Sequence, residues 1–200
     1  MDTLKIWNDN PSDRQLDEII RIIDNGDLVI LPTDTLYAIV CDALSPKAIE
    51  QLCRLKGINP DKTHLSIICA DISMAAEYAR IDNSAFKMLR SNTPGAFTFL
   101  FPTASSLPKA FKGRKVVGIR IPDCRTDLKL VERLGRPLLT TSIEFDDDDY
   151  AINPELVAEA YEGRVALTVD GGDGETEPST VIDCTSRDFE IVRQGKGELI

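Results

Sequence analysis

Apolar and polar positions along the chain predict helices and strands in irregular succession. In residues 12–26, Leu16, Ile19 and Ile23 fall on one face at helical spacing, and Ser12 with Gln15 has the pattern of a capping box. The same reasoning predicts further helices, and short apolar runs predict strands. We expect helices over 12–26, 45–57, 72–80, 83–91, 126–134 and 154–161, and strands over 28–32, 36–41, 65–70, 96–101, 116–121, 137–141, 165–169, 181–184 and 189–192.

This succession favours an α/β domain built on a mixed sheet, because both single and double strand steps occur between the helices. No internal repeat is visible and no linker is long enough to divide the chain, so we predict one domain over residues 1–200. The 42% apolar content and 28% charge are ordinary for a soluble globular protein.

The most unusual feature is an interruption between two apolar runs, over 28–32 and 36–41, that are both typical of buried strands. The interruption consists of Thr33, Asp34 and Thr35, without a turn-forming glycine. Two interpretations remain open. The three residues form a turn capped by its own side chains, or they form the floor of a pocket that presents hydroxyl groups to a small polar ligand.

Cysteine usage and the first residues predict a cytoplasmic protein. The five cysteines are widely spaced without a CxxC pair, so we expect reduced, mostly buried thiols and neither a disulfide framework nor a zinc site. His64 is the only histidine, which argues against a metal site built from histidine. The first residues lack the basic and apolar regions of a secretory signal, and no apolar run is long enough to span a membrane.

The net charge of −10 argues against avid binding of nucleic acid by the chain as a whole. The charge is unevenly distributed, however: residues 141–180 hold a local balance of −11, whereas residues 109–136 hold +6. A basic stretch is usually a solvated face, but an anionic ligand would need one. Four consecutive aspartates, Asp146 to Asp149, are interpreted as a solvated loop, with a Mg²⁺ site as the less favoured alternative.

Hydroxyl groups or arginines stand at the ends of several predicted strands. Sites in α/β sheets gather where strand ends meet, so these side chains are expected to share one cleft. Cations and hydroxyls together suit an amino acid or a nucleotide, although the chain has neither a dinucleotide-binding fingerprint nor a P-loop. The candidate residues are Thr33, Thr35, Arg120, Thr140, Thr141, Ser142, Ser179, Thr180 and Arg193.

Seven ordered blocks of the sequence resemble the YrdC domain, the family of threonylcarbamoyl-AMP synthases, and most of all its YciO-like branch. The resemblance extends from about residue 12 to residue 195. The blocks are residues 32–37 (PTDTLY), Lys56, and residues 93–95, 118–122, 140–142, 179–183 and 193–195.

The resemblance implies a YrdC-like twisted mixed α/β sheet with helices around a large concave cleft. It also implies a reaction in which L-threonine, bicarbonate and ATP, with Mg²⁺, give threonylcarbamoyl-AMP and pyrophosphate. The product is the donor for threonylcarbamoyladenosine, a modified base of certain tRNAs.

Matching the family's motifs residue by residue implies roles for nine side chains. Lys56 and Arg120 would be catalytic, because cations offset the negative charge that concentrates at the α-phosphate. Arg120 would also pair the threonine carboxylate at two points. The residues implied for threonine are Thr33, Thr35, Tyr37, Arg120, Thr140 and Ser179, and those implied for the nucleotide are Lys56, Ser142 and Arg193.

Three positions depart from the family pattern. Ala38 replaces a glycine, Ile58 replaces the arginine of a Lys-x-Arg motif, and Ile143-Glu144 follows Ser142 where the family has Ala-Asn. Losing an arginine contact to transition-state charge costs on the order of a hundredfold in rate.

Because of these departures, two alternatives to a synthase stay open. One is a translation-factor-like module that binds double-stranded RNA or tRNA, with residues 109–136 as its basic footprint. The other is a nucleotide-binding paralogue without synthase activity. We favour a site for a nucleotide or an amino acid over one for RNA.

Overall fold

A 10-stranded mixed sheet runs through the described part of the chain. The computed structural model describes residues 2–113, 115–143, 145, 150 and 152–200. The strands lie in the order β1-β8-β2-β3-β7-β4-β6-β5-β9-β10. Their bounds are β1 Asp2–Lys5, β2 Val29–Leu31, β3 Ala38–Asp42, β4 Leu65–Ile68, β5 Phe97–Pro102, β6 Val116–Arg120, β7 Leu138–Ser142, β8 Leu167–Asp170, β9 Thr180–Asp183 and β10 Glu190–Arg193.

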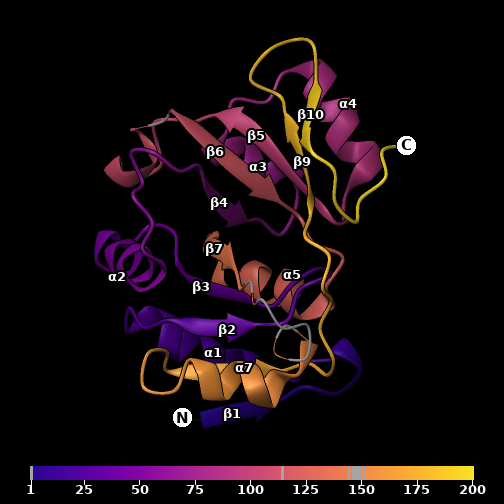
Figure 1. Cartoon of the computed structure of the whole chain (residues 1–200). Coiled ribbons are helices and arrows are strands. Elements are labelled where there is room, and N and C mark those ends of the chain that lie inside the picture. Colours follow the sequence, from indigo (N-terminus) through magenta and orange to yellow (C-terminus); the bar gives the residue numbers. More distant parts are fainter. Residues whose placement is uncertain (1, 114, 144, 146–149, 151) are drawn as a thin grey trace.

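The sheet is strongly twisted, since β2 and β3 run across the view of Figure 1 whereas β9 and β10 run nearly along its vertical. Parallel and antiparallel neighbours are both present, as in β4 with β6 and in β2 with β3. The predicted fold class, a twisted mixed α/β sheet, is therefore confirmed. The helices are η1 Trp7–Asp9, α1 Asp13–Asp24, α2 Pro46–Lys56, α3 Ile72–Tyr78, α4 Asn83–Asn92, η2 Lys109–Phe111, α5 Arg125–Leu134 and α7 Pro154–Ala160.

Both faces of the central strands are buried, which explains their continuous apolar runs. Ile30 and Ile39 pack on the face covered by α2, in one of two hydrophobic clusters. Val29 and Val40 point to the opposite face, where α1 and α5 cover them. The strands β2 and β3 pair antiparallel, so the Thr33-Asp34-Thr35 interruption forms the loop of a hairpin.

Local sequence signals set most of the helix boundaries. The predicted capping box is present: the Ser12 hydroxyl accepts a hydrogen bond from the Gln15 amide, and the Gln15 side chain accepts one from the Ser12 amide. Helix α2 has Ser45 as its N-cap and Pro46 in its first turn, and it ends at Gly57, whose φ of 65° is left-handed. Observed bounds differ from the expected ones by at most two residues.

Three elements were not predicted: β1, η1 and η2. Strand β1 is mostly exposed and pairs only with β8 at the edge of the sheet, so it carries no buried apolar run that would predict it. Both η elements are three residues long, too short for a helical period. The expectations for Asp146 to Asp149, and for Glu144, lie outside the described residues.

All five cysteines are buried and unpaired, as predicted. Burial raises the pKa of each thiol, that of Cys184 to about 12. Among the described residues no helix has the length and apolar content that a membrane crossing requires.

The segment after β10 returns across the molecule and fastens two distant regions. The Thr180 hydroxyl donates to the Gly197 carbonyl oxygen at 2.6 Å. The Lys196 ammonium donates to the backbone oxygen of Asp34 at 2.9 Å and forms an ion pair with Glu175 at 3.1 Å. The β2–β3 loop is therefore held from the far end of the chain.

Candidate functional site

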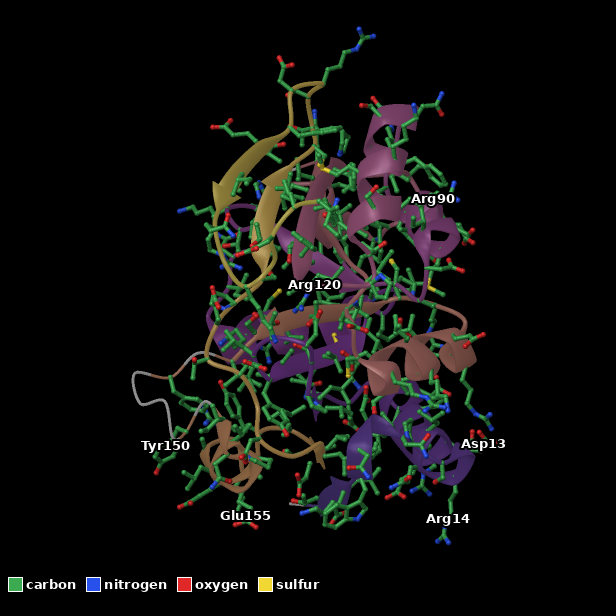
Figure 2. The ribbon with its side chains drawn as sticks, turned by 90° about the vertical axis from the view of Figure 1, so that its right-hand side faces the viewer. Asp13, Arg14, Arg90, Arg120, Tyr150 and Glu155 are labelled. Atoms are coloured by element: carbon green, nitrogen blue, oxygen red, sulfur yellow. The ribbon has the colours of Figure 1, made fainter. Side chains whose placement is uncertain are left out.

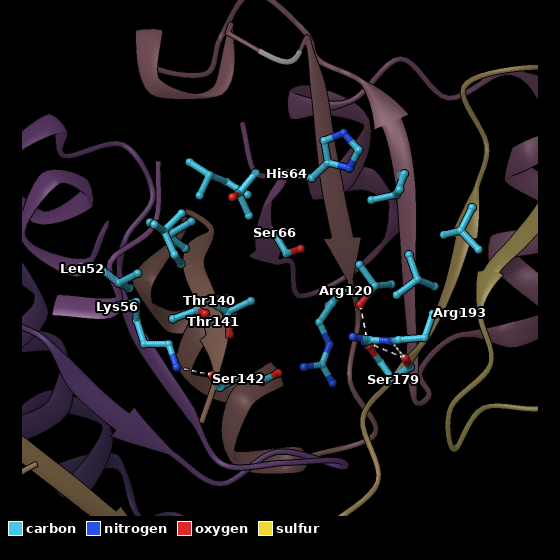
Figure 3. Close-up of a pocket in the computed structure, with 18 of the residues that line it drawn as sticks. Leu52, Lys56, His64, Ser66, Arg120, Thr140, Thr141, Ser142, Ser179 and Arg193 are labelled. Carbon is cyan, nitrogen blue, oxygen red and sulfur yellow. Dashed lines mark hydrogen bonds between the residues drawn. The ribbon is translucent and has the colours of Figure 1, made fainter. Parts of the chain in front are cut away.

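A cavity of about 530 Å³ opens over the middle of the sheet. Its walls come from α2, β7, β4, β6, β5, β9 and β10, so they combine residues far apart in the sequence. Figure 3 shows Lys56 and Ser142 on one side, Ser179 and Arg193 on the other, and Arg120 between them. Six of the predicted site residues line this cavity: Lys56, Arg120, Thr140, Ser142, Ser179 and Arg193.

Arg120, the last residue of β6, is the central cation of the cavity. The residue is only 3% exposed, and Figure 2 shows it in the interior, whereas Arg14 and Arg90 point outward. Its Nη2 donates to Asp34 Oδ1 and to Thr35 Oγ1, both at 2.9 Å. Its Nε is buried and has no hydrogen-bond partner among the described residues.

These bonds bear on the expected mode of carboxylate binding. A carboxylate grips a guanidinium at two points through Nε with Nη2, or through Nη1 with Nη2. Both pairs include Nη2, whose two hydrogens are already used. In the absence of a ligand Arg120 therefore has only Nε and Nη1 as unused donors, and the two-point pair with a carboxylate stays a prediction.

Hydroxyl groups from two strands and the start of a third line the wall near Arg120. Thr140 Oγ1 is buried without a partner among the described residues, so its hydrogen-bonding capacity is unused. Ser179 Oγ and Thr98 Oγ1 lie 2.8 Å apart. Thr98 lines the cavity but was not predicted as a site residue. Its position between Phe97 and Phe99 in a strand already placed its side chain on the face opposite to the two phenylalanines.

The two cations that flank Arg120 are held by backbone oxygens. Lys56, at the end of α2, donates from Nζ to the Ser142 carbonyl oxygen at 3.1 Å. Arg193 donates to the Ser179 carbonyl oxygen from Nε at 3.2 Å and from Nη2 at 2.8 Å. Both side chains are thereby aimed along the cavity wall, where an anionic ligand would meet them.

Thr33, Thr35 and Tyr37 do not line this cavity, which corrects the prediction for these three residues. Thr33 Oγ1 accepts from the Thr35 amide at 3.0 Å and donates to the Leu36 carbonyl at 2.8 Å, so it caps its own turn. The Thr35 hydroxyl accepts a hydrogen bond from Arg120 Nη2. The interruption is therefore a turn capped by its own side chains, and its residues are not among those that line the cavity.

The Tyr37 hydroxyl forms hydrogen bonds with the backbone of the glycine-rich loop that follows β8. It donates to the Gly172 carbonyl oxygen at 2.7 Å and accepts from the Gly171 amide at 3.2 Å. Burial raises the pKa of Tyr37 to about 12, so the side chain stays a neutral donor. It fastens the glycine-rich loop and is not available to a ligand in the cavity.

Further cavity residues were not predicted as site residues, among them Ile58, His64, Ser66 and Asp183. Ile58 puts an apolar group on the wall beside Lys56, where the family pattern has an arginine. Asp183 is the acidic residue among the described residues that line the cavity. No cluster of three potential metal ligands occurs in the described ranges.

A second carboxyl lies buried within electrostatic range of Arg120. Asp127 on α5 is fully buried, and neither of its oxygens has a hydrogen-bond partner in the part of the chain that is described. Burial raises the pKa of Asp127 well above its ordinary value, with Arg120 opposing the rise and Asp34 adding to it. Two carboxyls therefore interact electrostatically with Arg120: Asp34 is hydrogen-bonded to it, whereas Asp127 is not.

A family model, Sua5_yciO_yrdC, described by the words "Telomere recombination", matches residues 21–195. The chain belongs to this family. It is 32% identical over 197 residues to the uncharacterized protein YciO of Escherichia coli strain K12, covering 97% of this chain and 95% of that protein.

Solved structures of the family share the fold. The crystal structure of E. coli YciO superposes with a TM-score of 0.91 at 32% identity, covering 99% of this chain and 98% of that one. P. abyssi Sua5 in complex with L-threonine superposes with a TM-score of 0.88 at 26% identity, covering 98% of this chain and 58% of that one. The expected resemblance to the YrdC family, and to YciO within it, is confirmed.

Proposed function

We propose that this protein binds L-threonine beside ATP in the cavity and forms threonylcarbamoyl-AMP from L-threonine, bicarbonate and ATP. One observation carries the proposal: Arg120, Thr140 and Ser179 converge on a single cavity in a chain that shares its fold with a Sua5 that binds L-threonine. The reaction type comes from the family resemblance. The product would serve tRNA modification.

The cavity residues suit this task through positioning and charge. The free Nε of Arg120 would donate to the threonine carboxylate, and the unpartnered Thr140 hydroxyl would bond the ligand's own hydroxyl. A site with a buried hydroxyl that needs a partner rejects amino acids that lack one. Lys56 and Arg193 would stabilise phosphate charge, so catalysis rests on orientation and electrostatics.

Mg²⁺ would accompany ATP and bind chiefly to the phosphate oxygens. Nucleotide-bound Mg²⁺ usually keeps several waters and takes one or two carboxylates from the protein. Asp183 on the cavity wall fits such a role, whereas the described residues contain no larger ligand cluster. When bound, the ion would neutralise charge on the phosphates.

The decisive test measures formation of the product. Purified protein is incubated with labelled L-threonine, bicarbonate, ATP and Mg²⁺, and the carbamoylated adenylate and pyrophosphate are quantified. Product should depend on all three substrates and fall about tenfold or more in Thr140→Val, because a buried hydroxyl contact is lost. Thr103→Val, on a threonine remote from the cavity, is the matched control. Absence of product at high enzyme concentration would overturn the synthase.

Binding measurements separate the synthase from a paralogue that only binds nucleotides. Thermal shift with threonine, with ATP and with both should show that each ligand strengthens stabilisation by the other. Stabilisation by the nucleotide alone, without product, would instead support the paralogue that lacks synthase activity.

A second candidate function, binding of double-stranded RNA or tRNA, is favoured by one surface feature. Arg80, Lys112 and Lys115 surround a separate pocket of about 460 Å³, and none of them has an ion-pair partner among the described residues. The rest of the basic stretch is dispersed. Arg120 is buried against Asp34, and Arg133 and Arg136 pair with aspartates of neighbouring elements.

Salt dependence tests this candidate. A complex with duplex RNA should weaken steeply as salt rises, because phosphate contacts release counterions. The double variant Lys112→Glu with Lys115→Glu should abolish the gel shift, whereas Lys87→Glu on α4 should leave it unchanged. Equal effects of both changes, or no shift at low salt, would exclude this surface.

A further inference from the structure

The ion pair between Arg120 and Asp34 is the most enclosed one in the described part of the chain. The two side chains are 4% and 8% exposed, whereas every other described pair has at least one partner exposed by a quarter or more. The pair joins the end of β6 to the β2–β3 loop, across 86 positions of sequence. A pair this well shielded from solvent has a defined geometry.

Asp34 is itself fixed from three directions. Its Oδ1 accepts from Arg120 Nη2 and its Oδ2 accepts from the Asp123 amide, each at 2.9 Å. Its backbone oxygen accepts from Lys196 Nζ at 2.9 Å. Asp34 is therefore held in one position, and its hydrogen bond fixes the orientation of the Arg120 guanidinium.

The bonds to Asp34 and Thr35 decide which N–H groups of Arg120 remain unused. Nη2 is saturated, so Nε and Nη1 are the donors that remain. Asp34 does not line the cavity, whereas Arg120 does. Asp34 thus acts on a ligand only through Arg120.

Asp127 does not replace Asp34 as a counterion, because burial raises the pKa of its carboxyl well above the ordinary value. Its carboxyl is buried, has no hydrogen-bond partner among the described residues, and lies within electrostatic range of Arg120. If the Asp34 carboxylate were removed, the buried cation would lose its bonded counterion. Leaving a buried charge unpaired is costly, so the guanidinium would no longer be held in its present orientation.

We propose that Asp34 is a positioning residue, which holds the Arg120 guanidinium toward the cavity and restricts a ligand carboxylate to single contacts with Nε and Nη1. The identity of that ligand as an amino acid rests on the proposed function. The positioning itself is a property of the ligand-free protein, and it is measured separately.

The first experiment observes Arg120 Nε–H directly by ¹H–¹⁵N NMR without ligand, with the signal assigned through its loss in Arg120→Lys. In Asp34→Ala the signal should shift strongly or vanish. In Asp34→Asn it should shift less, because an amide oxygen still accepts one bond. Asp173→Asn, a nearby exposed acid without a described partner, is the control and should leave the signal in place. An unchanged signal in Asp34→Ala overturns the proposal.

The second experiment compares binding of L-threonine with L-threoninamide, which lacks the carboxylate. The wild type should prefer L-threonine, and Asp34→Ala should change that preference about tenfold or more, because the Arg120 guanidinium loses both its counterion and its fixed orientation. Asp173→Asn should keep the preference. A preference unchanged in Asp34→Ala overturns the role in ligand binding. If the wild type binds neither compound, the proposed function fails, and the NMR result still decides the positioning.

Discussion

Asp127 shows how burial of one side chain couples stability to pH. Burial raises the pKa of its carboxyl well above the ordinary value, although Arg120 opposes the rise. In the unfolded chain the same group loses its proton near pH 4. Between those two pKa values the folded protein binds more protons than the unfolded one, so the free energy of unfolding falls as pH rises.

Asp127→Asn removes this titrating group. The free energy of unfolding of the variant should therefore not show this fall as pH rises. The wild type should lose up to about 1.4 kcal/mol per pH unit relative to the variant, from pH 4 upward until the folded pKa is reached. Urea unfolding of both proteins between pH 4 and pH 8 measures the difference. Parallel curves for the two proteins would contradict the expectation.

Ile58 provides a test of the charge of the cavity. Ile58→Arg would place a second cation beside Lys56 on the wall, and we expect the affinity for ATP to rise about tenfold, as for one charge-assisted contact. Ile58→Gln introduces a shorter polar side chain without the charge and is the control. Calorimetric titration with ATP gives the two affinities, and equal values would contradict an electrostatic effect.

At the level of single residues, the sequence could identify which chemical groups gather but not which way they point. Six of the nine predicted site residues line the cavity. Thr33 and Thr35 belong to the right loop, yet their hydroxyls face the turn and Arg120. The orientation of the Thr35 hydroxyl depends on Arg120, 85 positions away, which local patterns do not encode.

Among the elements, α5 begins with a cap supplied through space. Its N-cap residue, Cys124, makes no capping hydrogen bond with its side chain. Asp9 fills that role instead: Oδ2 accepts from the Arg125 amide at 2.5 Å and Oδ1 from the Thr126 amide at 2.7 Å. A carboxylate at this position also meets the positive end of the helix dipole.

Asp9→Ala should lower the free energy of unfolding by about 1–2 kcal/mol, because two helix amides lose their acceptor. The control is Asp2→Ala, which removes an exposed acid of β1. Chemical denaturation of both variants provides the comparison. A loss in Asp9→Ala no larger than that in Asp2→Ala would show that the cap contributes nothing.

The elements themselves were largely predictable, for a physical reason. Central strands such as β2 and β3 are buried on both faces, so their sequences are continuous apolar runs. Helices such as α1 carry their start signal within four residues. The exposed edge strand β1 and the distant cap of α5 have no local signal, and both were missed.

For the whole molecule, the linear distribution of charge was a poor guide to surface charge. The stretch over 109–136 is basic in sequence, but Arg120 turns inward and Arg136 pairs with Asp24 and Asp42. The fold class followed from the alternation of elements and from the family resemblance. The cavity required the three-dimensional meeting of strands that the sequence order does not give.

The strands that line the cavity are neighbours in one sheet, from β7 through β4, β6 and β5 to β9, and each is joined to the next by backbone hydrogen bonds. Within the described residues this pairing is continuous from the Lys56 side to the Arg193 side, so we expect ligand capture without closure of two lobes. Small-angle X-ray scattering should therefore give the same radius of gyration with and without threonine and ATP. A reproducible decrease in the radius of gyration on binding would show that the sheet bends when the ligands bind.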